Sequence, residues 1–593
     1  MKTIIELINE KLTAAFEEAG IPAEFAKATV SNRPDLCEYQ CNGAMAAAKT
    51  LHTAPLGIAE KAVAALSEDE TFAEAAAVRP GFINLKLSPE ALAAYLNLIA
   101  ADDKLGVSGM GKGKTAIIDY GGANVAKPLH IGHLRSAIIG ESIKRMYGFN
   151  GYDVIGDVHL GDWGLQMGLI IEATRDAQPD LPYFDENYTG EYPEEAPFTI
   201  SDLERIYPAA SARSKVDPDF AARAHAATLK LQQKDPGYYA LFKQIMRVSL
   251  PDLKKNYDRL NVHFELWKGE SDVQEYIPDM IQSFKDQGLL YESEGAMVID
   301  VAEPTDTKEL PPCLILKSDG AALYATTDLA TLLEREQLYA PDEMVYLTDK
   351  RQDMHFKQVF RVAKKAGIVP EDVKLQFLGF GTMNGEDGKP FKTRSGGVMR
   401  LESLIEEIYD AVYQRIQGNE ELSEEEAKQE AEVISLAALK YGDLSNQASK
   451  DYVFNVEKFI SFEGNTGPYI LYCIVRIKSI LRKYAESAAD GDAAFDAASV
   501  VPAAGSAAEK ALQLALARVN EVLEGACRDL APHRLCQYIY EIANAFSSFY
   551  HETRILAEPD EEKRAGYIAL LKLTLKVLLT CIDLLGFEAA DRM

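Results

Sequence analysis

The fold of this chain is decided by residues 115–155, which read TAIIDYGGANVAKPLHIGHLRSAIIGESIKRMYGFNGYDVI. Thr115–Tyr120 is a short apolar run typical of a buried strand, and Tyr152–Ile155 is a second one. Between them, apolar residues from Ile131 to Met146 recur at helical spacing. A strand, a loop, a helix and a strand in succession predict a βαβ unit, the beginning of a doubly wound, Rossmann-type parallel sheet.

The same rhythm returns much later in the chain, in the apolar runs Cys313–Lys317, Met344–Thr348 and Val373–Leu378. Before them, residues 176–220 are rich in Asp, Glu, Pro and Tyr and read as a surface insertion, whereas helical patterning covers about 219–290. The sequence therefore predicts an α/β catalytic domain whose parallel sheet is interrupted by an inserted region at about 171–310.

Two further domains are predicted on either side of this sheet. Residues 1–107 begin with an amphipathic helix and end in the alternating stretch PGFINLKLS, which indicates an additional N-terminal α+β domain. The glycine-rich residues 108–114 mark its boundary, so the catalytic domain is expected at 108–435. Residues 436–593 have helical patterning almost throughout, apart from an Ala-, Asp- and Ser-rich loop at 485–508, and predict an all-α domain.

The composition is that of a soluble protein with several buried cores. The 593 residues are 47% hydrophobic and 26% charged, which argues against disorder as the dominant state. The formal net charge of −29 argues against a non-specific DNA coat or a polybasic membrane-surface protein. It does not exclude a nucleic-acid partner, because the charge near the contact decides binding.

The cysteines and the most apolar late stretch argue against a disulfide framework and a membrane span. The seven cysteines are scattered and form no Cys-x-x-Cys pair, which favours a reducing, cytoplasmic setting and predicts no structural metal. Residues 570–587 are interrupted by Lys572, Lys576 and Asp583, so this stretch predicts an amphipathic helix and no membrane contact.

The motif that carries chemistry is His130-Ile131-Gly132-His133, at the predicted start of the first crossover helix. A helix N-terminus presents free N–H groups and a partial positive charge, and so attracts phosphate. Two imidazoles can donate hydrogen bonds to a phosphate as charge builds up during displacement. Gly132 leaves room for a nucleotide to lie against the backbone. The motif therefore predicts a nucleotide site.

His130–His133 matches the HIGH signature of class I aminoacyl-tRNA synthetases, and the surrounding string DYGGANVAKPLHIGHLRS resembles arginyl-tRNA synthetases in particular. The resemblance continues in one linear order through GDVHLGDWGLQMG, LYATTDLA, RQDMHF, GKPFKTRSGG and DYVFNVEKFISFEGNTGPYILY. Residues 1–100 are similar to that family's extra N-terminal domain, notably in RPGFINLKLS.

That resemblance implies an arginine–tRNA ligase. Such an enzyme activates L-arginine with ATP to arginyl-adenylate and transfers arginine to the 3'-terminal ribose of tRNA(Arg), releasing AMP and pyrophosphate. It implies ATP as a substrate, Mg²⁺ on the ATP phosphates, and a cytoplasmic monomer whose N-terminal domain contacts tRNA. His130 and His133 would be catalytic, and Gly132 would lie against ATP.

The resemblance also implies an arginine pocket. Tyr324 and Asp328 are four residues apart and share a face if LYATTDLA is helical. Arginine is a permanently charged planar fork of donors, so a selective pocket needs a carboxylate and an apolar wall. By resemblance, Asp328 pairs with the guanidinium and Tyr324 lines the pocket. Asp119, Asn124 and Gln352 match the family's other substrate contacts.

The second signature of class I synthetases, a Lys-Met-Ser-Lys-Ser loop, is only partly matched. Residues 391–397 read FKTRSGG, in which Lys392 and Arg394 are the candidate contacts to ATP. Lys127 precedes HIGH at the position where the family is thought to supply a compensating lysine. A lysine there can reach phosphate as a mobile point charge. Which of these three residues replaces the missing first lysine stays open.

A basic cluster in the helical domain is the candidate tRNA contact. Its members are Arg476, Lys478, Arg482 and Lys483, beside Tyr469 and Tyr472. Basic groups with aromatic rings suit phosphate contact and stacking on unpaired bases. By resemblance, this domain, residues 436–593, binds the anticodon loop. In contrast, the acidic run at 420–432 predicts a solvated helix face.

Two other functions were weighed against the ligase. A catalytically silent tRNA-binding relative with a regulatory role would not need His130, His133, Lys127 and Asp328, all of which are present. A class I synthetase for another amino acid, such as cysteine, would carry a zinc site of Cys and His near the sheet. No such cluster is seen in the sequence.

Overall fold

The structure is a computed structural model that describes residues 1–127, 129–318, 320–389, 399–418, 422–487 and 500–592. The chain divides into two compact units. One comprises Met1–Met110, Ser461–Asp583 and Glu588–Met593, and the other comprises Gly111–Ile460 and Leu584–Phe587. The first and last parts of the chain therefore belong to the same unit, and the nucleotide motif belongs to the other.

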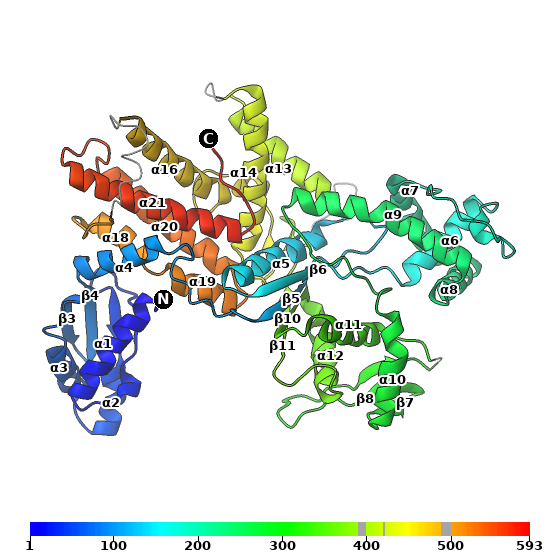
Figure 1. Ribbon diagram of the computed structural model, residues 1–593, viewed down its shortest axis with the longest axis horizontal. Helices are drawn as coiled ribbons and strands as arrows, with labels where there is room; N and C mark the ends of the chain where they lie inside the picture. Colours follow the sequence, from blue (N-terminus) through cyan, green and yellow to red (C-terminus); the bar gives the residue numbers. More distant parts are fainter. Residues whose placement is uncertain (128, 319, 390–398, 419–421, 488–499, 593) are drawn as a thin grey trace. The chain divides into compact units, whose positions relative to one another are not determined.

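The second unit is built on a four-stranded parallel sheet with the order β11-β10-β5-β6. The strands are β5 (Thr115–Asp119), β6 (Asp153–Asp157), β10 (Glu343–Asp349) and β11 (Lys374–Phe380). Helix α5 (Ile131–Phe149) joins β5 to β6, and α12 (Asp353–Lys365) joins β10 to β11 on the opposite face of the sheet (Figure 1). The predicted βαβ unit and doubly wound sheet are confirmed. The strand order reverses between β5 and β10, where such sheets place their ligand crevice.

The region between β6 and β10 is larger than the predicted insertion and carries its own sheet. Its helices are α6 (Leu165–Ala177), α7 (Ile200–Ser214), α8 (Pro218–Gln232), α9 (Pro236–Arg259), α10 (Ile277–Asp286), η2 (Pro182–Phe184) and η3 (Gln274–Tyr276). Its three-stranded antiparallel sheet contains β7 (Leu290–Ser293), β8 (Ala296–Ile299) and β9 (Cys313–Leu316). Helix α11 (Tyr324–Tyr339) then leads into β10.

One sequence prediction in this region is wrong, and one segment contains a helix that its composition did not indicate. Cys313–Lys317 does not continue the parallel sheet, because β9 pairs with β8 in the antiparallel one. Burial alternates along β9, with Leu314 exposed between buried neighbours, as expected for a sheet covered on one face. Residues 176–220 do contain a helix, α7, which begins at a Thr199–Asp202 capping box. The low apolar content and Pro208 hid its periodicity.

Helix α5 is buried along most of its length by the sheet and by later helices. Gly140 lets it approach β5, since a Cβ there would lie 2.2 Å from Cγ of Tyr120. Arg135, 1% exposed, donates to Asp443 Oδ2 at 3.0 Å and to the Gly381 carbonyl at 2.7 Å. Asp443 belongs to α14 (Glu424–Leu444), which packs with α13 (Leu401–Ile416) beside α15 (Val456–Phe459), β12 (Met383–Asn384) and β13 (Tyr452–Val453). The helix that carries the nucleotide motif is thus fixed from several sides.

The first unit contains an α/β layer and a helical layer. The strands β1 (Ala28–Val30), β2 (Tyr39–Cys41), β4 (Phe82–Leu87) and β3 (Phe72–Val78) form an antiparallel sheet in that order. With it lie α1 (Ile4–Glu18), η1 (Ala23–Phe25), α2 (Gly43–Leu51), α3 (Pro55–Ala65) and α4 (Pro89–Ala101). The predicted opening helix and the strand in PGFINLKLS are both present. Lys510 of the helical part pairs with Glu38 at 2.5 Å and ties the two layers together.

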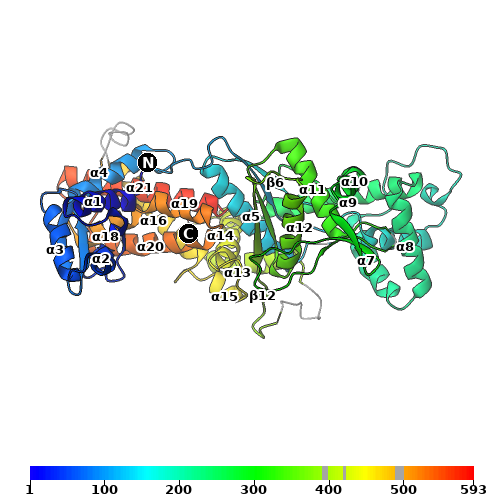
Figure 2. The same cartoon turned by 90° about the horizontal axis from the view of Figure 1, so that it is seen from below.

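The helical layer confirms the predicted all-α character of the late chain. It contains α16 (Gly467–Ser487), α18 (Ala507–Leu516), α19 (Val519–Arg528), α20 (Pro532–Glu552) and α21 (Glu561–Leu584), and Figure 2 shows α16, α20 and α21 running alongside one another. Part of the predicted loop at 485–508 lies outside the described residues. Helix α21 is long and apolar enough to cross a membrane by length and composition, but 67% of its apolar window is buried, as in a core helix.

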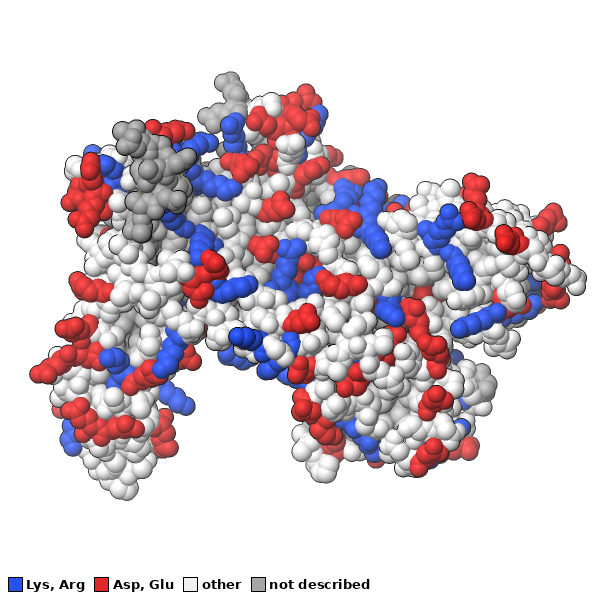
Figure 3. Space-filling model, viewed as in Figure 1, with Lys and Arg blue, Asp and Glu red and all other residues white. Residues whose placement is uncertain are grey.

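The acidic run predicted at 420–432 lies largely on the N-terminal end of α14. Glu424, Glu425 and Glu426 are exposed in the first turn of this helix, where the macrodipole favours negative charge. Figure 3 shows acidic side chains gathered over this end of α14. The solvated helix face is therefore confirmed for the described residues of the run.

A buried lysine marks where Leu584–Phe587 packs within the second unit. Lys440 of α14 is completely buried and donates to the Gly586 carbonyl at 2.7 Å. Asn261 donates to the same carbonyl at 3.1 Å, and the Phe587 ring meets Tyr441 edge-on. Burial lowers the pKa of Lys440 to about 7, although Glu141 opposes the shift.

Lys440→Met is expected to flatten the pH dependence of stability. Between about pH 7 and the pKa of an unfolded lysine, the unfolded chain binds one proton more than the native one, so wild-type stability rises with pH there. Thermal unfolding of the full chain from pH 6.5 to 9.5 should therefore show a smaller rise for the variant. Lys428→Met, at an exposed position of the same helix, is the control; equal slopes for all three proteins would refute a depressed pKa.

Candidate active site

The two histidines of the nucleotide motif form a hydrogen-bonded cap on helix α5. His130 Nδ1 accepts from the Gly132 N–H at 3.0 Å, and His133 Nδ1 accepts from the His130 N–H at 3.1 Å. The two ring centroids lie 4.0 Å apart. Since both Nδ1 atoms act as acceptors, the ring protons belong on Nε2. Each imidazole therefore has an Nε2–H donor left to offer a ligand.

Both imidazoles are neutral at physiological pH. Burial and the nearby Lys127 ammonium lower the pKa of His130. Burial, with smaller contributions from His130 and Lys127, lowers the pKa of His133 to about 3. The pair can thus donate hydrogen bonds to phosphate while keeping the Nε2–H tautomer.

Gly132 is required by the histidine cap itself. A Cβ at this position would lie 2.7 Å from Cε1 and 2.9 Å from Nδ1 of His130. Any side chain would displace the His130 ring from its hydrogen bond. The sequence suggested that Gly132 leaves room for a nucleotide, whereas the structure shows a more direct reason, the contact with the His130 ring.

The chain that follows the second signature pairs with the first. The Ile131 N–H donates to the Met399 carbonyl at 3.2 Å, and the Leu401 N–H donates to the Leu129 carbonyl at 3.0 Å. His130 and Arg400 form an isolated antiparallel bridge between these bonds. Lys392 and Arg394 lie outside the described residues, but the segment that begins at Met399 is fixed beside the histidine cap.

Lys127 lies within reach of the same helix end. Its Nζ stands 4.6 Å from the centre of the Tyr207 ring, which α7 contributes from the insertion. Asn124, in the same loop, pairs with Gly161 in a parallel bridge. Ala126 between them has a φ of 61°, a left-handed conformation that costs energy for a residue with a Cβ. This loop is therefore held in a specific, strained course.

The carboxyl ends of β5 and β6 share one buried arginine. Arg335 of α11, 1% exposed, donates from Nη2 to Asp119 Oδ2 at 2.6 Å and to Asp157 Oδ2 at 2.7 Å. Its guanidinium lies over the ring of Tyr346 on β10. Asp119, predicted to hold substrate, is thus already engaged in a structural ion pair. Burial raises its pKa, which Arg335 counteracts.

Tyr324 and Asp328 lie on one helix, α11, as their spacing predicted. Tyr324 begins the helix and is 72% exposed. Asp328 Oδ2 lies 2.5 Å from Nε2 of His355 in the first turn of neighbouring α12. Gln352, at the N-terminus of α12, is exposed. An arginine side chain that pairs with Asp328 must therefore share this carboxylate with His355 or displace His355 from it.

Sequence reasoning missed Glu270, a second carboxylate beside Asp328. Burial above all, with smaller contributions from Asp162 and Asp328, raises its pKa to about 7, while His159 opposes the shift. Among the described residues, Glu270 has no ion-pair partner. The sequence placed it inside the stretch of helical patterning at about 219–290, whereas the structure places WKGES in a loop between α9 and η3, so its spacing gave no sign of a site. A carboxylate that is costly to ionise and lies near enough to another to feel its charge is suited to a cationic ligand.

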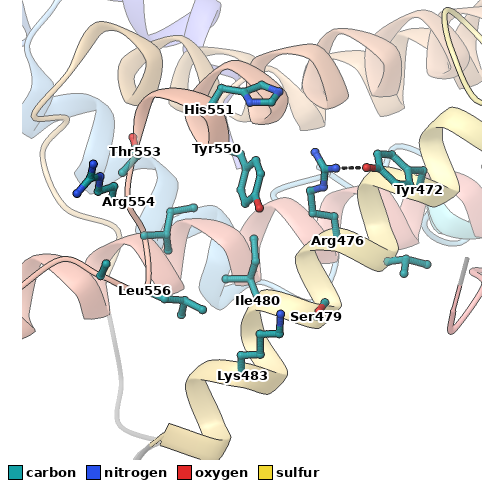
Figure 4. Close-up of a pocket in the computed structure, with 13 residues that line it drawn as sticks. Tyr472, Arg476, Ser479, Ile480, Lys483, Tyr550, His551, Thr553, Arg554 and Leu556 are labelled. Atoms are coloured by element: carbon teal, nitrogen blue, oxygen red, sulfur yellow. Dashed lines mark hydrogen bonds between the residues drawn. The ribbon is translucent and has the colours of Figure 1, made fainter. Parts of the chain in front are cut away.

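The candidate tRNA residues divide between a groove and other surfaces. A cavity of about 610 Å³ is lined by Arg476 and Lys483 of α16 together with Tyr472, Tyr550, His551 and Arg554 (Figure 4). Arg476 stacks on the rings of Tyr472 and Tyr550. Lys478 does not line the groove and pairs with Asp591 at 2.9 Å. Arg482 is exposed on another side of α16, and Tyr469 bonds to Asn544.

Metal ligands are not grouped in the described part of the chain: no three or more His, Cys, Asp or Glu side chains there lie close enough to hold an ion. Around the histidine cap the available groups are N–H donors and a lysine, whereas Mg²⁺ prefers oxygen ligands. The donors of this site therefore do not fit a metal held by protein side chains.

A doubly wound parallel sheet with His-Ile-Gly-His at the start of its first crossover helix defines a class I aminoacyl-tRNA synthetase. Residues 96–456 match the family described as tRNA synthetases class I (R), catalytic domain. Residues 2–87 match the arginyl tRNA synthetase N terminal domain, and residues 470–593 match the DALR anticodon binding domain.

Full-length relatives narrow the class to one family. The chain is 58% identical to an arginine–tRNA ligase of Agathobacter rectalis and 53% identical to one of Alkaliphilus oremlandii, each covering 100% of both chains. Arginyl-tRNA synthetases from Plasmodium falciparum (TM-score 0.81, 24% identity) and Thermus thermophilus (TM-score 0.77, 21% identity), each covered fully, share its fold. The chain therefore belongs to the arginyl-tRNA synthetases, the class I enzymes that act as arginine–tRNA ligases.

Gly132→Ala is expected to lower the rate of adenylate formation at least about tenfold without unfolding the protein, because the displaced His130 ring no longer presents its donor. ATP–pyrophosphate exchange and thermal unfolding measure the two effects. Gly148→Ala on the same helix is the control, since a Cβ there meets nothing within 4 Å. Equal exchange rates for both variants would contradict the role given to the histidine cap.

Proposed function

We propose that this chain activates L-arginine with ATP to arginyl-adenylate and transfers arginine to the 3'-terminal ribose of tRNA(Arg), releasing AMP and pyrophosphate. The observation that carries the proposal is a juxtaposition. Two neutral imidazoles cap α5, with Nε2–H donors that no described residue accepts from, and carboxylates of α11 and the WKGES loop lie at the carboxyl side of the same sheet. The histidine cap suits the phosphates of ATP, and the carboxylates suit a cationic amino acid.

In the first step, the arginine carboxylate attacks the α-phosphate of ATP and pyrophosphate leaves. His130 and His133 donate from Nε2 to the phosphoryl oxygens, where charge builds up. Lys127 adds a mobile positive charge, and we assign Lys392 and Arg394 to the same task from the sequence. Mg²⁺ enters as the counter-ion of ATP, held by phosphate oxygens, because the described donors do not suit it.

The arginine side chain is bound by paired carboxylates. We assign Asp328 and Glu270 to the guanidinium, with the exposed ring of Tyr324 covering its flat face. Asn124 and Gln352 are assigned to the α-amino and carboxylate groups. Asp119 is assigned to the same pocket, where its negative charge is partly neutralised by the ion pair with Arg335. A monocation in this pocket would offset the cost of ionising the buried Glu270 carboxylate.

tRNA binding is assigned to the helical unit. Arg476 and Lys483 supply positive charge inside an aromatic groove, which suits phosphate contact next to unpaired bases. Arg482 and Lys478 remain candidates for contacts outside the groove. We also propose that the additional N-terminal domain contacts tRNA, and that the protein acts as a cytoplasmic monomer.

Asp328→Asn tests the proposed reaction and its pocket. Loss of a charged bidentate contact costs about 1–3 kcal/mol, so the KM for arginine should rise about tenfold or more while the KM for ATP barely changes. Pyrophosphate exchange and aminoacylation, each with arginine and tRNA(Arg) present, are the measurements. A wild-type chain with no exchange would instead fit a silent tRNA-binding relative. An unchanged arginine KM in the variant would remove Asp328 from the pocket.

Arg476→Glu should raise the KM for tRNA and flatten its dependence on salt, because fewer counter-ions are released on binding. Arg534→Glu is the matched control in the same helical layer, since Arg534 of α20 lies outside the groove, is already paired with Asp529 and is not a candidate tRNA contact. KM values for tRNA from 50 to 200 mM salt compare the two proteins. Identical salt slopes for the Arg476 variant and the wild type would place the tRNA elsewhere.

A further inference from the structure

The loop that carries Glu270 is an extension of the parallel sheet. Residues 266–269 run beside the chain that leaves β6, with parallel bridges between Asp157 and Leu266 and between Leu160 and Gly269. The Leu160 N–H donates to the Lys268 carbonyl at 2.7 Å, and the Glu270 N–H donates to the Leu160 carbonyl at 3.1 Å. The backbone of Glu270 is therefore fixed at the carboxyl edge of the sheet.

Asp162, in the GDWG turn, holds this loop from the other side. Asp162 is 1% exposed and accepts two hydrogen bonds from Ser271, from the N–H at 3.0 Å and from Oγ at 2.6 Å. Gly269 packs directly on the same carboxylate, since a Cβ there would lie 2.6 Å from Asp162 Oδ2. The residues before and after Glu270 are thus both seated on one buried carboxylate.

We propose that Asp162 is a positioning residue for arginine recognition: through Ser271 and Gly269 it sets the carboxylate of Glu270 at the guanidinium end of the pocket. This inference rests on the proposed function, because it takes Glu270 and Asp328 as the groups that bind the guanidinium. It gives the GDWG turn a role in substrate specificity that the sequence did not reveal.

The chemistry of the substrate explains why such a clamp matters. A guanidinium binds carboxylates through parallel N–H···O bonds, so affinity depends on the direction of the carboxylate as well as on its charge. A long glutamate side chain on a surface loop would sample several rotamers and lose entropy on binding. Fixing the loop on both sides of Glu270 removes part of that cost in advance.

A packing role for the GDWG turn would leave Asp162 unexplained. Trp163 fills the core by meeting the Phe242 ring edge-on at 5.3 Å, and this contact does not involve Asp162. Burial raises the pKa of Asp162 to about 6, so its ionised form carries a free-energy cost in the native state. The backbone N–H of Trp163 donates to the Glu270 carboxylate and favours its charged form. Asp162 and Trp163, two consecutive residues of the turn, therefore both act on the Glu270 side chain.

A double-mutant cycle between Asp162 and Glu270 tests the proposal. Asp162→Asn keeps the shape but presents an amide group to the Ser271 donors, and Glu270→Gln removes the charge that the clamp is said to position. The KM for arginine is measured in aminoacylation at pH 8, above the pKa of both carboxyl groups, with ATP and tRNA saturating. The ATP KM and the thermal unfolding midpoint are measured alongside.

We expect Asp162→Asn to raise the arginine KM roughly tenfold in the wild-type background and less than about twofold when Glu270 is already Gln, since residues that act through one another are not additive. Ser271→Ala repeats the cycle with a milder change if Asp162→Asn does not fold. Glu172→Gln is the control for a buried carboxylate elsewhere: Glu172 pairs with Arg223 at 2.6 Å, so its loss should lower stability only.

The outcomes distinguish a failure of the positioning role of Asp162 from a failure of the proposed arginine pocket. Equal effects of Asp162→Asn in both backgrounds would overturn the positioning role while leaving Glu270 in the pocket. An unchanged arginine KM for Glu270→Gln alone would instead remove Glu270 from the proposed pocket. A fall in the unfolding midpoint with normal arginine KM for both Asp162→Asn and Ser271→Ala would make the turn a packing element and would also refute the proposal.

Discussion

The ion pairs of Arg335 are the constraint on which the catalytic unit depends. One guanidinium nitrogen joins Asp119 and Asp157, the last residues of β5 and β6, to a helix that also carries Asp328. Three charges buried together are costly, and removal of one partner would leave the others uncompensated. This cluster therefore fixes β5, β6 and α11 relative to one another. The histidine cap, which follows β5, and the arginine pocket on α11 depend on that arrangement.

The same arrangement explains how the site combines two opposite electrostatic demands. The N-terminus of α5 must attract phosphate and presents neutral imidazole donors, whereas the far side must attract a cation and presents carboxylates. At the point where the strand order reverses, β5 faces both regions. Asp119, at the end of this strand, is paired with Arg335. Buried pairing here organises neighbouring chemistry more than it stabilises the fold.

Sequence patterns predicted the elements that local spacing and helix caps define. They did not predict the features that depend on contacts between distant segments. The βαβ unit, the start of α5 at His130, and the shared face of Tyr324 and Asp328 were all predictable, because each is a local consequence of spacing. The pairing of β9 was not, since a short apolar run does not reveal its partner. Nothing in the sequence marks Arg335 as buried, and Glu270 lies in a stretch where the sequence predicted helical patterning but the chain forms a loop. Their roles come from distant chain segments that only folding brings together.

The contact between Gly586 and Lys440 has a consequence for synthesis on the ribosome. Gly111–Ile460 form nearly all of the catalytic unit, yet Leu584–Phe587 complete it only after residues 461–583 have been made. Until then, the buried Lys440 ammonium lacks the Gly586 carbonyl, and the Tyr441 ring lacks Phe587. A chain that stops before residue 584 therefore leaves this seam of the catalytic unit open to water, with the Asn261 carbonyl still beside Lys440. Shortened chains are thus expected to have a less stable catalytic unit and to be cut by proteases more readily than the full chain.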